Sequence, residues 1–252
     1  MNIVMITGAS SGIGKEFAFQ MDEGFRNVDE FWLIARSEDK LKSLSARLKH
    51  KTRVIPMDIT DENALTGLIK LVMREKAVVR VLVNCAGYGI MGNFAKNGSI
   101  AELGMIRLNC EALTSLTHKM LPFMKKGSRI IQMASSAAFL PQPDFAVYAA
   151  TKAYVLSFSR ALGEELLSRG IYVTSVCPGP VDTPFFDIAE KNGHTLKIKK
   201  FFIVPASRVV AAALHDSYLK KRLSVCSIPI KIFAVVTKFI PHEILLRFMR
   251  LM

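Results

Sequence analysis

Short runs of apolar residues alternate along this chain with longer segments in which apolar residues recur every three or four positions. Most of the short runs lack polar alternation, which is typical of strands that are covered by helices on both faces. They predict seven strands, at Asn2–Ile6, Glu30–Ala35, Arg53–Met57, Val79–Asn84, Ser128–Ala134, Ile171–Cys177 and Leu223–Cys226. Strands of this kind predict a central parallel sheet.

The segments between these strands have helical spacing, and several begin with Ser or Asp, which are favourable N-cap residues. They predict helices at Gly12–Glu23, Glu38–His50, Asp61–Lys76, Ser99–Lys125, Ala146–Ser168 and Ala206–Lys220. The alternation of strand and helix indicates an α/β fold of repeated βαβ units. Because we find no internal repeat and no low-complexity linker, we expect one domain over residues 1–252.

Two later parts of the chain depart from this alternation. The stretch Pro178–Pro205 is irregular, and a long loop in a compact domain is usually a functional lid. Beyond it, residues 229–252 predict two short amphipathic helices, with basic residues away from their apolar stripes. The first stripe contains Ile232, Phe233, Val236, Phe239 and Ile240, and the second contains Ile244, Leu245, Phe248, Met249 and Met252.

These two helices have three possible roles. They could rest on a membrane interface, cover a hydrophobic substrate entrance or pack against another subunit. We favour the last two, because globular enzymes often bury such stripes without lipid.

The composition narrows the class of protein. Half of the 252 residues are apolar, which excludes a disordered chain. The chain is also long enough to form a hydrophobic core that needs no disulfides or structural metals. There are 34 basic and 21 acidic side chains, and the resulting charge of +13 favours either anionic ligands or an anionic membrane surface. The basic clusters are scattered and lack the interleaved aromatic residues of a nucleic-acid binder, so we expect no nucleic acid partner.

The cysteines and the lengths of the apolar runs indicate the cellular compartment of the protein. Cys85, Cys110, Cys177 and Cys226 form no Cys-x-x-Cys pair, so we expect neither a metal site nor a disulfide framework. The N-terminus lacks the pattern of a signal peptide, and charged residues interrupt the longest apolar stretches. We therefore expect a cytoplasmic protein without a membrane span.

A glycine-rich turn, Thr7-Gly8-Ala9-Ser10-Ser11-Gly12-Ile13-Gly14, follows the first strand and opens the first helix. Glycines let the backbone approach a pyrophosphate, and the start of a helix favours its negative charge. The spacing differs from both G-x-G-x-x-G and the P-loop, and a turn that merely joins strand to helix is the alternative. The candidate dinucleotide contacts are Gly8, Ser10, Ser11, Gly12, Ile13 and Gly14.

The second strand ends in Ala35-Arg36, where an NAD(H) site would have an acidic residue. This favours NADP(H) over NAD(H), with Arg36 as a bidentate partner of the extra phosphate. The alternative is a solvated cation at a helix start, and Glu38 and Asp39 lie close in sequence.

Two further segments would lie along the same cofactor edge. Asp58 and Ile59 follow the third strand and are candidate cofactor contacts. Asp58 could accept a hydrogen bond from the adenine amino group, or cap the next helix. Asn84-Cys85-Ala86-Gly87 follows the fourth strand, and Asn84, Ala86 and Gly87 are candidate cofactor contacts.

Tyr148 and Lys152 are four residues apart at the start of a predicted helix, and so share one face. A phenol titrates near pH 10 in isolation, and an adjacent ammonium stabilises the phenolate, which suits a general acid or base. A surface pair is the alternative. Ser135, at the end of the fifth strand, could donate to a substrate oxygen, with Ser136 as a competitor. Asn109 disfavours the helix in which it lies unless its amide has a partner, so it suggests a buried polar role.

Together these residues resemble the short-chain dehydrogenase/reductase family. The resemblance covers most of the chain: Thr7–Gly14, Asp58, Asn84–Gly87, Asn109, Ser135, Tyr148 with Lys152, and Pro178-Gly179-Pro180-Val181-Asp182-Thr183. Cys85 departs from it, since the family usually has a second asparagine there.

The resemblance implies a Rossmann-type, doubly wound, seven-stranded parallel sheet in a three-layer αβα sandwich. It also implies hydride transfer between a nicotinamide and a carbonyl or alcohol. Tyr148 would pass the proton, Lys152 would lower its pKa and hold the nicotinamide ribose, Ser135 would orient the substrate oxygen, and Asn109 would hold a water in the proton relay. The nicotinamide end would be held by Pro178, Gly179, Val181 and Thr183. A homodimer or homotetramer built on the fourth and fifth helices is also implied.

The expected lid, about residues 183–205, is strongly apolar. Its apolar residues are Phe185, Phe186, Ile188, Leu196, Ile198, Phe201, Phe202 and Ile203. With Phe139 and Leu140 beside Ser135, they suggest a bulky apolar ketone or alcohol, steroid-like or fatty-acyl. Core or subunit packing would explain the same residues equally well. The rival to an enzyme is a non-catalytic NADP(H)-binding sensor or scaffold on the same fold, against which the complete set Tyr148, Lys152, Ser135 and Asn109 argues.

Overall fold

A computed structural model of the chain describes residues 1–191 and 203–251. Seven strands form a parallel sheet: β1 (Asn2–Thr7), β2 (Glu30–Ala35), β3 (Thr52–Pro56), β4 (Val78–Asn84), β5 (Arg129–Met133), β6 (Tyr172–Val176) and β9 (Leu223–Ser224). Their order is β3-β2-β1-β4-β5-β6-β9. The chain therefore winds outward from the centre in both directions, and the reversal falls between β1 and β4. Such a switch point is where open α/β sheets bind ligands.

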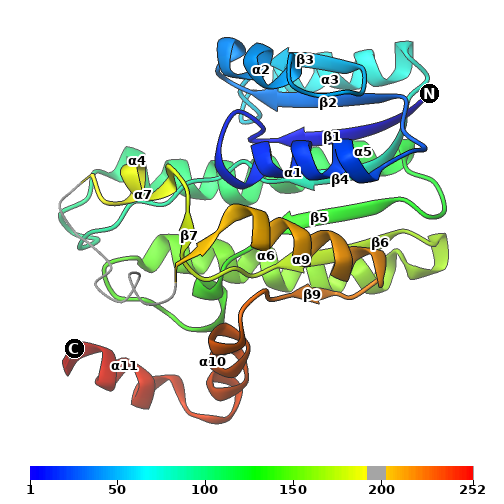
Figure 1. Ribbon diagram of the computed structural model, residues 1–252. Coiled ribbons are helices and arrows are strands. Elements are labelled where there is room, and N and C mark those ends of the chain that lie inside the picture. The colour runs from blue at the N-terminus through cyan, green and yellow to red at the C-terminus, as the bar shows by residue number, and fades with distance from the viewer. Residues whose placement is uncertain (192–202, 252) are drawn as a thin grey trace.

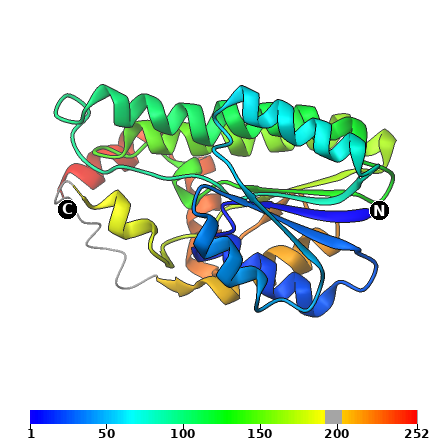
Figure 2. The ribbon, with the colours of Figure 1, turned by 90° about the horizontal axis from the view of Figure 1, so that it is seen from above.

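Helices cover both faces of the sheet (Figures 1 and 2). On one face lie α1 (Gly12–Gly24), α2 (Glu38–Ser45) and α9 (Ala206–Tyr218). On the other lie α3 (Glu62–Arg74), α5 (Leu113–Met120) and α6 (Ala146–Glu165). Alternate residues of β1 point to opposite faces: Ile3 and Met5 pack in one apolar cluster, Val4 and Ile6 in the other. The three-layer αβα sandwich and the doubly wound sheet are confirmed.

The long helix expected at Ser99–Lys125 is interrupted. It comprises α4 (Ser99–Ile106), a π-helical turn (Arg107–Ala112), α5 and a 3₁₀ turn (Leu121–Phe123). Single π-helical turns inside helices often mark functional sites. Asn109 lies in this turn.

The helix expected at Glu38–His50 is shorter than predicted, because α2 ends at Ser45. The backbone N–H groups of Lys49 and His50 each donate to the Asp22 carboxylate of α1, at 2.8 Å. These bonds hold the segment after α2 against α1 in a non-helical path.

The irregular stretch Pro178–Pro205 contains short elements within its described part. They are β7 (Val181–Asp182), α7 (Phe185–Ala189) and β8 (Val204–Pro205), and β7 pairs in parallel with β8. Of the expected lid residues, Leu196, Ile198, Phe201 and Phe202 lie outside the described residues.

Two C-terminal helices, α10 (Ile228–Phe239) and α11 (His242–Leu251), stand apart from the three layers, beyond β9 (Figure 1). Met252, the last residue of the second expected stripe, lies outside the described residues. Among the helices that the structure describes, none has the length and apolar character needed to cross a membrane.

Candidate active site

The residues singled out in the sequence gather at the carboxyl edge of the sheet. The glycine turn follows β1, Asn84–Gly87 follows β4, Ser135 follows β5 and Pro178–Thr183 follows β6. In a parallel sheet these ends share one edge, which is why segments far apart in sequence meet there.

The glycine turn needs glycine for steric reasons. Gly8 has φ +66° and Gly12 has φ +52°, both in the left-handed region that favours glycine. A Cβ on Gly14 would overlap the carbonyl oxygen of Gly8, and one on Gly8 would lie 2.9 Å from the Cα of Ala86. The turn therefore packs tightly both against the start of α1 and against the end of β4.

The start of α1 is suited to an anion. Its N-cap residue, Ser11, makes no side-chain capping hydrogen bond, and the first turn holds no acidic residue. Ser10 is half-buried, whereas Ser11 is exposed. The first N–H groups of the helix can therefore donate to an external acceptor such as a phosphate. A Cβ on Gly12 would lie 3.3 Å from the Thr183 side chain, so this turn faces the turn after β6. The arrangement fits the pyrophosphate of a dinucleotide.

Asp58 does not cap α3. The N-cap is Asp61, whose Oδ1 accepts from the N–H of Asn63 at 2.8 Å. Asp58 Oδ1 instead accepts from the N–H and hydroxyl of Thr60, at 2.9 and 2.7 Å. Burial would raise the pKa of Asp58, but these hydrogen bonds and the charge of Arg36 lower it below its usual value. Asp58 is therefore a carboxylate at neutral pH, at the edge where Arg36 also lies.

Arg36 is exposed just after β2. The nearby Glu38 pairs with Lys42 at 2.8 Å, and no carboxylate in the described part of the chain forms an ion pair with Arg36. Ile59, in contrast, is buried in the core, so its side chain lies away from the edge.

Asn84 points into the molecule. Its Nδ2 donates to Thr117 Oγ1 at 2.8 Å and to Gln132 Oε1 at 2.9 Å, and the residue is buried. Its side chain thus ties β4 to β5 and α5. Thr7, whose side chain the sequence reasoning did not single out, holds the neighbouring backbone: its Oγ1 accepts from the N–H groups of Cys85 and Ala86, at 3.0 and 3.1 Å.

Tyr148 and Lys152 are both buried on α6, which excludes the alternative of a surface pair. Lys152 Nζ lies 5.6 Å from the centre of the Tyr148 ring and donates to the backbone oxygen of Met133 at 2.8 Å. The Ser135 side chain hydrogen-bonds that of Tyr148, and Ser135 Oγ also accepts from the N–H of Ala137 at 3.2 Å. The strand end of β5 and the first turns of α6 therefore bring three of the four expected catalytic side chains together.

Asn109 joins this group from the π-helical turn. Its Oδ1 accepts from the N–H of Tyr88 at 3.1 Å, and its Nδ2 donates to Tyr88 O at 2.9 Å and to Thr151 Oγ1 at 3.1 Å. A Cβ on Gly87 would lie 2.9 Å from Asn109 Oδ1 and 3.5 Å from Lys152 Nζ. Asn109 and Lys152 therefore both reach the segment after β4.

Ser136 has a different position from Ser135. Its backbone N–H donates to the oxygen of Pro178 at 2.8 Å, which links the turn after β5 to the turn after β6. Among the two serines, it is the Ser135 hydroxyl that meets Tyr148.

The expected lowering of the Tyr148 pKa by Lys152 is wrong for this structure. Burial raises the pKa of Tyr148 to about 12, and the hydrogen bond with Ser135 offsets only part of that rise. Burial also lowers the pKa of Lys152 to about 8. Desolvation dominates because apolar groups surround both side chains, an effect that sequence spacing does not reveal.

Three thiols lie near the Lys152 ammonium. Burial raises the pKa of Cys85 and of Cys177 to about 12, and that of Cys110 to about 11, so all three are neutral at physiological pH. No carboxylate among the described residues pairs with Lys152. The Lys152 charge is therefore desolvated without an anionic partner.

Aromatic rings enclose Tyr148. Phe145 stacks on it with ring centres 4.2 Å apart, and Phe185 of α7 lies at 5.5 Å. Met91, Ala189 and Phe186 belong to the same apolar cluster. The N–H of Met91 donates to Ala189 O at 2.8 Å, which fixes α7 over the turn after β4. The surroundings of the phenol are therefore apolar on the side of α7.

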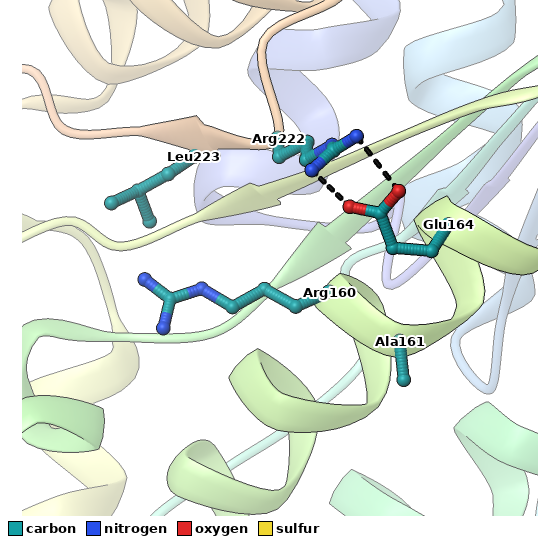
Figure 3. Close-up of a pocket in the computed structure, with 5 residues that line it drawn as sticks. All are labelled: Arg160, Ala161, Glu164, Arg222 and Leu223. Carbon is teal, nitrogen blue, oxygen red and sulfur yellow. Dashed lines mark hydrogen bonds and ion pairs between the residues drawn. The ribbon is translucent and has the colours of Figure 1, made fainter. Parts of the chain in front are cut away.

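A separate cavity of about 430 Å³ is lined by Arg160, Ala161, Glu164, Arg222 and Leu223 (Figure 3). Arg222 pairs with Glu164 there through two contacts, one of them at 2.9 Å. Arg160 lies twelve residues beyond Tyr148 on α6, about 18 Å along the helix axis. This cavity also lies at the amino end of β9, away from the carboxyl edge. Within the described residues no cluster of His, Cys, Asp or Glu could hold a metal ion.

Comparisons with known proteins bear on the family and the fold of this chain. A model of the short chain dehydrogenase family matches residues 2–193. Sulfoacetaldehyde reductase 2 of Chromohalobacter salexigens is 34% identical over 191 residues, which cover 73% of this chain and 74% of that protein. A very-long-chain 3-oxoacyl-CoA reductase of Phaeosphaeria nodorum is 31% identical over 218 residues, 81% of this chain and 62% of that protein.

A solved structure has a similar fold. It is a short-chain dehydrogenase from Sphingobium yanoikuyae in complex with NADPH, with a TM-score of 0.79 and 28% identity. The match covers 90% of this chain and 89% of that one.

Proposed function

Because this chain belongs to the short-chain dehydrogenase family of oxidoreductases, we propose that it is an NADP(H)-dependent enzyme that acts on a bulky apolar ketone or secondary alcohol. The observation that carries the proposal is the grouping of buried Tyr148 and Lys152 with Ser135 and Asn109, beside a glycine turn open to a phosphate.

The cofactor would lie along the carboxyl edge of the sheet. The turn from Gly8 to Gly14 and the start of α1 would bind its pyrophosphate, and Asp58 would accept from the adenine amino group. The turn from Pro178 to Thr183 would hold the nicotinamide end. When bound, the cofactor supplies or takes up the hydride.

The chain's own residues would manage the proton. With a pKa of about 12, Tyr148 holds its proton at neutral pH and can donate it to a substrate oxygen. Ser135, already hydrogen-bonded to the phenol, would orient the same oxygen. Lys152, with a pKa of about 8, is largely charged at pH 7 and would bind the ribose hydroxyls. This protonation state favours carbonyl reduction at neutral pH.

Asn109 would act as a positioning residue. Its amide holds both backbone groups of Tyr88 and the hydroxyl of Thr151, which itself donates to Tyr148 O at 2.8 Å. Asn109 therefore fixes the turn after β4 against the first turn of α6, which carries Tyr148. We propose that it also holds a water of the proton relay behind Lys152.

NADP(H) is favoured because Arg36 stands exposed at the end of β2 and forms no ion pair with a carboxylate of the described residues, while Glu38 is paired with Lys42. A guanidinium in this position can bind a 2′-phosphate with two hydrogen bonds. Similar solved structures hold either coenzyme, NADPH in the protein from Sphingobium yanoikuyae and NAD in one from Burkholderia phymatum, so the proposed preference rests on Arg36.

The apolar substrate is supported by Phe145 and Phe185, which flank the phenol, and by the apolar character of α7, which is one of the described parts of the expected lid. The relative named as a very-long-chain 3-oxoacyl-CoA reductase agrees with it, whereas the name sulfoacetaldehyde reductase implies a small polar substrate. A panel of bulky ketones, fatty-acyl ketones and small acidic aldehydes separates the two, and we expect turnover of the first two classes.

The test of the chemistry is Tyr148→Phe. Removing the proton donor should lower kcat by about 100-fold or more, with coenzyme binding retained. The matched control is Tyr154→Phe on the same helix, where the hydroxyl is exposed and meets Thr114 at 2.8 Å, and kcat should stay unchanged. Equal activity of the two variants would contradict the proposal. NADPH binding without turnover of any substrate would favour the sensor or scaffold instead.

A further inference from the structure

Helix α10 has two apolar faces, and only one of them is covered. On the inner face, Phe233 packs edge-on against Phe139 at 6.4 Å, and Ala234 and Thr237 are buried. Ile230 lies so close to Gly179 that a Cβ there would be 2.9 Å from its Cδ1. This face fixes α10 against the turns after β5 and β6.

The outer face is a continuous apolar stripe. Ile228, Ile232, Val235 and Phe239 follow one another at spacings of four, three and four residues, which places them on one side of the helix. Their exposed fractions are 71, 59, 52 and 81%. Ile240 and Ile244 continue the exposed apolar surface toward α11, at 37 and 48%. Four apolar side chains in one stripe are far more than the scattered exposure of an ordinary surface.

The sequence placed Ile232, Phe233 and Phe239 together on one stripe, with a role in covering a substrate entrance or packing against another subunit favoured over lipid. The structure separates Phe233 from the other two. The inner face is sufficient to dock α10, so the outer face is left without cover from any described residue.

The stripe is bordered by positive charge. Lys231 and Lys238 are exposed, lie seven residues apart on the same flank, and have no acidic neighbour within α10. From Leu223 to Met252 the chain has four basic residues, Lys231, Lys238, Arg247 and Arg250, and one acidic residue, Glu243. The whole chain carries +13. An apolar stripe beside lysines is the pattern of helices that lie in the plane of an anionic lipid surface.

We propose that the outer face of α10, continued by Ile240 and Ile244, docks this protein on an anionic lipid surface. The apolar side chains enter the boundary between headgroups and acyl chains. Lys231 and Lys238 extend along the flank, with their ammonium groups at the lipid phosphates. The contact is peripheral, since no described helix can span a bilayer.

A second copy of the chain fits this face less well than lipid. Two copies would bring the same lysines together, and each copy carries +13, so the contact would be opposed by like charge. The chain also offers a different apolar face for self-association, on α4 and α6, with Ile100 and Leu103 exposed at 88 and 50% and Tyr154 at 42%.

The test is cosedimentation of the full chain with vesicles, which requires neither coenzyme nor substrate and so is independent of the proposed function. We expect binding to phosphatidylcholine vesicles that contain phosphatidylglycerol, and weak binding to phosphatidylcholine alone. Ile232→Ser with Val235→Ser should weaken binding about tenfold or more. Lys231→Gln with Lys238→Gln should weaken it about fivefold for each lysine removed.

Controls come from α3, at the opposite edge of the sheet (Figure 1). Met73 is 61% exposed and Lys70 is exposed, so Met73→Ser and Lys70→Gln match the two changes in chemistry and should leave vesicle binding unaltered. Thermal unfolding checks that all variants remain folded, and the lysine pair serves as the test if the serine pair does not fold.

Three results would overturn the proposal. The first is no binding to anionic vesicles. The second is binding that both α10 pairs leave unchanged. The third is an oligomer that Ile232→Ser with Val235→Ser dissociates in the absence of lipid, which would assign the face to a second copy.

Discussion

At the scale of single residues, the least expected property is the desolvated charge of Lys152. Its pKa falls from an ordinary value of 10.5 to about 8 through burial. In the unfolded chain the amine titrates near 10.4, so between about pH 8 and 10.5 the unfolded state binds more protons than the folded state. Stability due to this group therefore rises with pH across that window, and its destabilising effect is complete below pH 8.

Lys152→Met should then stabilise the fold at pH 7 by up to about 3 kcal/mol, while abolishing activity. The lost hydrogen bond to Met133 O reduces this stabilisation by about 1 kcal/mol at every pH. The burial argument is therefore tested by how the stability difference between variant and wild type changes with pH. Urea unfolding at pH 7 and at pH 10.5 measures it: the advantage of the variant should shrink as the pH rises. Lys70→Met, at an exposed position, should show no such trend. A difference that is constant with pH would refute the burial argument.

Arg36→Leu tests the coenzyme preference. Loss of a charged hydrogen-bonding partner should raise the KM for NADPH about tenfold or more, with the KM for NADH unchanged. Lys40→Leu, on the exposed side of α2, should change neither value. Initial rates with both coenzymes measure the two KM values. An equal rise of the KM for NADPH and for NADH would mean that Arg36 attracts both coenzymes by its charge and does not recognise the 2′-phosphate.

Several site residues could be predicted from spacing, but their environments could not. The four-residue interval between Tyr148 and Lys152 places both on one face of any helix. Ser135 could be predicted because it stands at the end of the fifth expected strand. Whether Asn84 points toward the edge or into the core depends on Thr117 and Gln132, which are distant in sequence. The direction of the Tyr148 pKa shift likewise depends on rings such as Phe145 that only the folded chain brings near.

At the scale of elements, the glycine turn is the most constrained. Gly14→Ala should destabilise the fold by several kcal/mol and abolish coenzyme binding, because its Cβ would overlap the carbonyl oxygen of Gly8. Gly67→Ala is the matched control in the interior of α3, where a Cβ meets nothing within 4 Å. It should stabilise by about 0.5–1 kcal/mol. Thermal unfolding of both variants measures this, and a stable Gly14→Ala protein would contradict the close packing.

Most element positions follow from the apolar pattern, since the helices bury one face of helical period and most strands are short apolar runs that are buried on both faces. The exceptions have tertiary causes. The π-helical turn Arg107–Ala112 accompanies the hydrogen bonds of Asn109 to Tyr88 and Thr151, and periodicity gives no sign of it. The early end of α2 depends on Asp22, which binds the chain beyond it.

At the scale of the whole molecule, parallel strands and the switch point between β1 and β4 bring four turns to one edge, and every proposed role depends on that convergence. Apolar pattern alone predicted a parallel sheet, whereas the doubly wound order followed from the resemblance. Which side of α10 stays uncovered could not be predicted, since both of its faces are apolar and only the fold shows which one meets Phe139.

The most direct test of the proposed hydride transfer traces deuterium from NADPH to the product. The protein is incubated with NADPH that carries deuterium at both positions of the hydride-donating carbon of the nicotinamide and with a bulky ketone, and the alcohol is analysed by mass spectrometry. We predict that the alcohol gains one deuterium at its carbinol carbon. Alcohol without the label, or no alcohol from any ketone of the panel while NADPH binds, would contradict hydride transfer at this site.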